Sequence, residues 1–122
     1  MEVTFMFNTA IILFAVAALG GATMAVLHFR GRAAPPVVLA VLHGLFAASG
    51  LVVLSLAVLR SGLEGTPAIA LGLFLLAALG GFGLLSFHLR RRRLPGALVL
   101  GHGLLAVAAF LLLLVAFLGT SS

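Results

Sequence analysis

Four histidines are the side chains whose chemistry differs most from their surroundings in this 122-residue chain. They form two matching sets, His28 and His43 in the first half and His88 and His102 about sixty residues further on. Imidazole is costly in hydrocarbon, where ionisable side chains are rare and usually face a bundle interior or a functional site. The histidines are therefore the candidate functional residues.

The sequence around the histidines is repeated as well. An Ala-Leu-Gly-Gly segment ends at Gly21 and again at Gly81, and a His-Gly-Leu segment begins at His43 and again at His102. The offset is constant except for one residue lost between the two motifs of the second copy. We therefore predict a tandem duplication, with one repeat in residues 1–62 and the other in residues 63–122.

The elements that must position the histidines are membrane-spanning helices. Hydrophobic residues make up 64% of the chain and charged residues 7%, whereas about a quarter of a soluble domain is charged. Four apolar stretches have about the 20 residues that a helix needs to cross a bilayer. They are residues 3–29, 36–59, 67–89 and 95–118. We predict an all-α membrane protein, a four-transmembrane-helix bundle made of two parallel tandem repeats of a helical hairpin.

Charge predicts the orientation of this bundle. All the basic residues are arginines, and most fall between the first and second stretches or between the third and fourth. The positive-inside rule therefore places loops 30–35 and 90–94 in the cytoplasm and both termini outside. The arginine-only, alanine-rich composition indicates a bacterial inner (cytoplasmic) membrane. Because topology explains the net charge of +5, we expect no nucleic-acid partner.

The chain contains no cysteine, which excludes disulfides, thiolate metal sites and covalent c-type haem attachment. Hairpin geometry, with turns centred on the prolines, predicts that all four histidines lie in one layer, about two helical turns from the cytoplasmic loops. Each histidine shares a helix stripe with small residues, of the kind that lets membrane helices approach closely. We therefore expect the histidines to face inward.

The leading hypothesis for this layer is non-covalent haem b, because buried neutral imidazoles are suitable axial ligands. The candidate axial ligands are His28, His43, His88 and His102. Arg30 and Arg90 are the candidate partners of the haem propionates, and Gly21, Gly44, Gly81 and Gly103 are expected to make room for the macrocycle. One haem would need one equivalent pair, His43 with His102 or His28 with His88. Two haems are favoured, since duplication copies a whole site.

The chain would then be an electron carrier rather than an enzyme, exchanging electrons near the cytoplasmic face with quinol or a partner redox protein. The arrangement resembles four-helix membrane b-type cytochromes in pattern alone. One alternative is a zinc or copper site built from the same histidines. Another is a non-catalytic membrane subunit or assembly protein, homo-oligomeric or bound to a larger complex, whose histidines and glycines only pack helices against one another.

Overall fold

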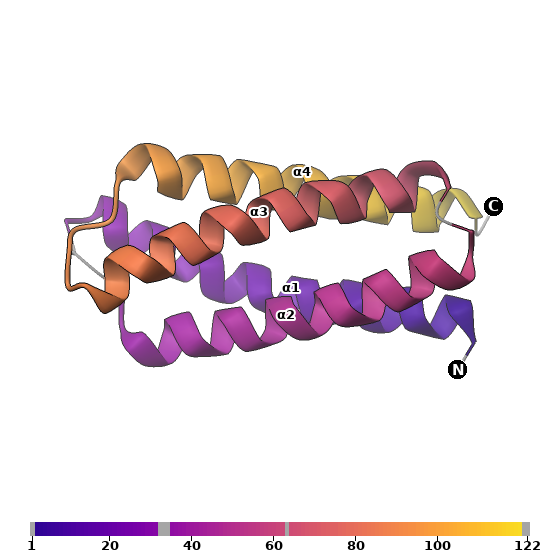
Figure 1. Cartoon of the computed structure of the whole chain (residues 1–122), viewed down its shortest axis with the longest axis horizontal. Helices are drawn as coiled ribbons and strands as arrows, with labels where there is room; N and C mark the ends of the chain where they lie inside the picture. Colours follow the sequence, from indigo (N-terminus) through magenta and orange to yellow (C-terminus); the bar gives the residue numbers. More distant parts are fainter. Residues whose placement is uncertain (1, 32–34, 63, 121–122) are drawn as a thin grey trace.

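The computed structural model describes residues 2–31, 35–62 and 64–120, and within this part of the chain it is all-helical. The described residues form α1 (Val3–Phe29), α2 (Val37–Arg60), α3 (Gly65–Leu89) and α4 (Gly96–Thr120). Consecutive helices run antiparallel, so α1 begins and α4 finishes at one end of the bundle, the terminal end (Figure 1). The connections α1–α2 and α3–α4 lie at the other end, the loop end. The all-α class and the helical bundle are confirmed.

Each helix is long and apolar enough to cross a membrane. The candidate spans contain 24 to 27 residues, and their mean hydropathy is between 2.3 and 2.6. Only 11% to 17% of the residues in each apolar window are buried inside the structure. Large contiguous apolar surfaces of this kind mark contact with a membrane or with other proteins.

The same kind of turn closes α1 and α3. The N–H of Gly31 donates to the carbonyl of His28 at 3.1 Å, and the N–H of Arg91 donates to the carbonyl of His88 at 3.1 Å. Both residues have a positive φ, +102° at Gly31 and +55° at Arg91. This left-handed residue after the helix satisfies carbonyls that the last turn leaves unpaired.

The four helices form a square in which chain neighbours are also neighbours in space. Contacts are densest between α1 and α2 and between α3 and α4, which form the two hairpins. The hairpins meet where α1 lies against α4 and where α2 lies against α3. Among the described residues, α1 and α3 are thus diagonal to one another, and so are α2 and α4. Only side chains that reach the bundle centre connect the diagonal helices.

An aromatic stack at the centre joins one diagonal. The rings of Phe14 on α1 and Phe74 on α3 are parallel within 4°, with their centroids 3.9 Å apart. Gly50 on α2 makes room for this stack, because a Cβ at that position would lie 3.0 Å from the Phe14 ring. Small residues such as Ala10 and Ala70 are completely buried around it. The core cluster consists of Ala10, Phe14, Leu54, Val58, Ala70, Phe74, Ala109 and Leu113.

This core occupies the part of the bundle towards the terminal end. Toward the loop end, beyond Ala17 and Ala77, full burial is rare. The helical segments in the half of the bundle towards the loop end are residues 18–29, 37–49, 78–89 and 96–108. His28 is the one buried residue among them. The helices therefore fill their shared interior more completely around the phenylalanines than around the histidines.

The phenylalanine stack should contribute measurably to stability. We expect Phe14→Ala and Phe74→Ala each to lower the free energy of unfolding, and the double variant to show a coupling of about 0.5 to 1.5 kcal/mol, as aromatic pairs do. The measurement is SDS unfolding of the purified protein in detergent micelles, followed by circular dichroism. Phe82→Ala is the matched control, because Phe82 is 67% exposed. Equal losses for Phe82→Ala and Phe14→Ala, or strict additivity, would contradict this role.

Candidate functional site

The structure places the four histidines at two levels of the bundle. His28 and His88 lie in the last turns of α1 and α3. His43 and His102 lie deeper, opposite Gly21 and Gly81 respectively. Gly21 precedes His28 by seven residues, which at 1.5 Å per residue is about 10 Å along the helix. The single layer expected from the sequence is wrong, because α1 continues to Phe29 and α2 begins only at Val37.

His43 and His102, hereafter the histidine pair, each bridge the two helices of a hairpin. Nδ1 of His43 lies 2.7 Å from the carbonyl oxygen of Ala17, and Nδ1 of His102 lies 2.7 Å from that of Ala77. A carbonyl oxygen only accepts hydrogen bonds, so the imidazole must be the donor and Nδ1 must carry the proton. In a neutral imidazole the other nitrogen, Nε2, then keeps its lone pair.

Glycines provide the seats for these two imidazoles. A Cβ on Gly21 would lie 3.0 Å from Cε1 of His43, and a Cβ on Gly81 would lie 3.1 Å from Cε1 of His102. One residue earlier, Gly20 and Gly80 face the Cβ atoms of the same histidines at 3.5 and 3.4 Å. The space beside these glycines, which the sequence suggested for a macrocycle, is thus taken by the imidazoles. Gly44 and Gly103 differ, since nothing lies within 4 Å of a Cβ at either position.

The histidine pair meets across the bundle centre. His43 comes from α2 and His102 from α4, the diagonal that the phenylalanine stack does not join. Their ring centroids are 6.0 Å apart, with an angle of 82° between the ring planes. Both side chains are half-buried. When both imidazoles are neutral, two Nε2 lone pairs therefore lie in one small region of the interior.

His28 is the most buried of the four histidines, with 7% of its surface exposed. Its ring packs edge-on against Phe29 at a centroid distance of 4.8 Å, and its Nε2 lies 4.0 Å from the Cβ position of Gly96 at the start of α4. Its Nδ1 is buried and has no hydrogen-bond partner among the described residues. A buried polar atom without a partner costs free energy, so a hydrogen-bond partner from beyond the described residues would be favourable at this nitrogen.

His88 and the two candidate propionate partners lie at the loop end. His88 is half-buried. Arg30 and Arg90 follow His28 and His88 by two residues, cap α1 and α3, and are exposed. Within the described part of the chain, no three histidines or acids come close enough to hold a metal ion together. A zinc or copper site with three or more histidine or acid ligands is therefore not formed by the described residues.

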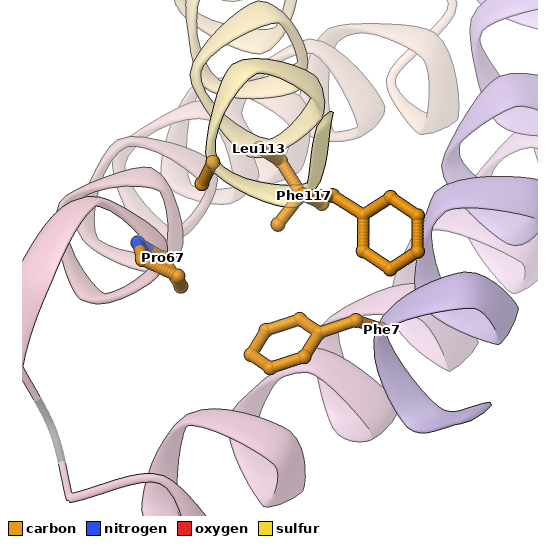
Figure 2. Close-up of a pocket in the computed structure, with 5 residues that line it drawn as sticks. Phe7, Pro67, Leu113 and Phe117 are labelled. Atoms are coloured by element: carbon orange, nitrogen blue, oxygen red, sulfur yellow. The ribbon is translucent and has the colours of Figure 1, made fainter. Parts of the chain in front are cut away.

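A separate cavity of about 50 Å³ lies near the terminal end (Figure 2). The side chains of Phe7 and Phe117 border it, and the residues that line it are all apolar. The residues that line it are Phe7, Pro67, Leu113, Ala116 and Phe117. Because none of them titrates or donates a hydrogen bond from its side chain, this cavity offers no chemistry and does not compete with the histidine pair as a site.

Sequence reasoning did not identify the carbonyls of Ala17 and Ala77 as partners of the histidine pair. Backbone acceptors have no sequence signature of their own. A signal was nevertheless present, because Ala17 and Gly21 share one helix stripe and recur as Ala77 and Gly81. A glycine one turn after the acceptor leaves that carbonyl open to a side chain from the next helix.

Filling the glycine seat should displace the imidazole. We expect Gly21→Val to push His43 away from Ala17 and to lower the free energy of unfolding by about 1 to 3 kcal/mol, as overpacking does. Gly44→Val is the matched control, because a side chain there meets open space, and surface changes stay within about 0.5 kcal/mol. SDS unfolding in micelles compares the two. Similar losses for both variants would show that Gly21 does not seat the imidazole.

Comparison of this chain with known protein families, with curated proteins and with solved structures finds no match. The functional argument therefore depends on the geometry of the histidine pair and its surroundings.

Proposed function

We propose that this chain is a multi-pass protein of a bacterial inner membrane that binds one haem b between His43 and His102 and carries electrons. The observation that supports it best is the state of the histidine pair. Each Nδ1–H is held by a backbone carbonyl at 2.7 Å, which leaves Nε2 free as a ligand. Histidines that bind metals are commonly oriented in this way, by donating the other ring N–H to a carbonyl or carboxylate.

The separation of the two rings supports one shared iron. An iron held by one nitrogen of each imidazole would need two rings that approach one another across the bundle centre, and the ring centroids of His43 and His102 are 6.0 Å apart there. Gly20–Gly21 on α1 and Gly80–Gly81 on α3 lie against the two imidazoles, so these positions place no side chain of their own against the rings.

The loop end suits the carboxylates of such a haem. The orphan Nδ1 of His28 lies there, together with the exposed guanidinium groups of Arg30 and Arg90. Charge-assisted hydrogen bonds to carboxylates are about twice as strong as neutral ones. His28 and His88 would thus lie near the haem carboxylates and would not be ligands of the iron. This arrangement favours one haem over the two that duplication suggested.

When bound, haem b supplies one-electron redox chemistry. The residues of this chain would fix the orientation of the two imidazoles through the carbonyls of Ala17 and Ala77, which accept the Nδ1–H and leave Nε2 for the iron. The histidine pair lies nearer the loop end, so electrons would pass near the cytoplasmic face. A quinol or a partner redox protein would be the exchange partner.

Haem binding is tested by absorption and stoichiometry. We expect protein purified from haem-replete cells to show a Soret band and one haem per chain. His43→Ala and His102→Ala should lose the bis-histidine spectrum, because each removes an axial ligand. His28→Ala and His88→Ala leave both proposed ligands in place, so the haem that these variants bind should keep the bis-histidine spectrum. No haem in the wild-type protein, two haems per chain, or a spectrum lost only in His28→Ala and His88→Ala would overturn the proposal.

A structural role for the histidine pair is the second candidate, and the same two hydrogen bonds favour it. A hydrogen bond between membrane helices contributes about 0.6 kcal/mol on average. His43→Asn separates the two functions, because the amide N–H₂ of asparagine can replace Nδ1–H as donor to Ala17 but cannot replace Nε2. If the role is structural alone, His43→Asn restores the stability lost in His43→Ala and no variant binds haem. If haem is bound, His43→Asn restores stability without restoring the spectrum.

The proposed topology places the loop end in the cytoplasm and both termini outside, with each hairpin as one copy of a duplicated unit. Since the chain has no cysteine, single-cysteine variants report on it directly. We expect an impermeant maleimide to label Ser61→Cys in right-side-out vesicles, and to label Arg92→Cys only after the membrane is opened. Labelling of Arg92→Cys alone in closed vesicles would mean the opposite orientation, and labelling of both would argue against membrane insertion.

A further inference from the structure

Arg91 adopts a backbone conformation that arginine disfavours. Its φ of +55° is the only positive φ of a non-glycine residue in the described part of the chain. The left-handed region brings Cβ too close to the following carbonyl oxygen, so glycine is the usual residue there. The turn itself is well formed, with the N–H of Arg92 donating to the carbonyl of Phe87 at 2.9 Å and that of Arg91 to the carbonyl of His88 at 3.1 Å.

The first hairpin shows that this turn does not need an arginine. Gly31 occupies the corresponding position after α1, with φ +102° and the corresponding hydrogen bond to His28. Glycine would therefore serve equally after α3, without the unfavourable backbone conformation. An arginine at such a position indicates that its side chain contributes something other than the fold.

The surroundings of Arg91 indicate what that contribution is. Residues Arg90 to Arg93, hereafter the arginine turn, are all exposed. The two acids of the chain, Glu2 and Glu64, precede α1 and α3 at the opposite end of the bundle. The arginine turn thus has no carboxylate side chain near it to neutralise it.

The arginine turn also lies at a defined level along the bundle, between an exposed and a buried leucine. Leu89, just before it, is 74% exposed on the apolar surface of α3, and Leu94, just after it, is buried with 8% exposed. The run of guanidinium groups therefore begins where the lipid-facing surface of the helix ends, which is the level of the headgroups. A soluble acidic partner would not require this position.

We propose that the arginine turn binds the phosphate groups of anionic phospholipids at the loop end. This inference depends on the proposed membrane insertion but not on haem. Guanidinium groups bind phosphate through paired N–H donors, and each basic residue near a membrane surface strengthens binding to anionic lipid by about fivefold.

The test uses a substitution that is expected to raise the stability of the protein and to weaken its binding of anionic lipid. Arg91→Gly removes the unfavourable backbone conformation and one charge together. We expect a higher melting temperature in detergent micelles and about fivefold weaker binding of phosphatidylglycerol, counted by native mass spectrometry. Phosphatidylcholine should bind weakly to both proteins. Unchanged phosphatidylglycerol binding by Arg91→Gly would overturn the proposal, whatever the melting temperature.

Three further measurements show whether weaker lipid binding comes from the arginine turn itself. Arg92→Gln should weaken phosphatidylglycerol binding to a similar extent without changing the turn. Arg60→Gln removes one charge at the terminal end and should leave binding unchanged. Inorganic phosphate at millimolar concentration should not displace the lipid. Equal weakening by Arg60→Gln would indicate a general charge effect, and displacement by phosphate would indicate a simple anion site, so either result would overturn the proposal. Labelling of the single-cysteine variants tests membrane insertion independently.

Discussion

Close approach between the helices of each hairpin is the constraint on which the rest of this structure depends. In a bilayer the lipid tails are as apolar as leucine, so helices associate through packing and hydrogen bonds rather than through the hydrophobic effect. Gly20–Gly21 and Gly80–Gly81 meet both requirements. They remove the side chains that would hold the helices apart, and they admit an imidazole that reaches the carbonyl of Ala17 or Ala77. The histidine that bridges each hairpin is also the one whose ring meets its counterpart from the other hairpin, with the ring centroids 6.0 Å apart.

The two diagonals of the bundle are joined by different kinds of contact. The stack of Phe14 and Phe74 joins α1 to α3, with ring centroids 3.9 Å apart and small buried residues around it. The histidine pair spans the other diagonal, with ring centroids 6.0 Å apart. Few residues are fully buried at this level of the bundle. The apolar level around the phenylalanines is thus the more completely filled of the two, and the level of the histidine pair is the less completely filled.

The sequence predicts the helices well, because length and hydropathy are local properties. It also indicates that the histidines share stripes with small residues. It does not predict the levels of the histidines along the bundle, because α1 already ends at Phe29 and the middle of the connection to α2 therefore lies before the prolines. It fails too on what each glycine faces. A glycine in a helix stripe predicts close approach, but whether the neighbour is an imidazole, as at Gly21, or open space, as at Gly44, depends on the phase of the opposite helix.

The hydrogen-bond acceptors of the histidine pair are backbone atoms, which changes what mutation can do to them. No substitution at Ala17 or Ala77 can delete a carbonyl oxygen, so the bond depends on spacing rather than on residue identity there. The partners are 26 residues apart in the first hairpin and 25 in the second, yet both bonds measure 2.7 Å. The connecting loop has absorbed the missing residue. Selection on such a contact would tolerate deletions in the loop and reject them within the helices, where one residue rotates everything beyond it by about 100°.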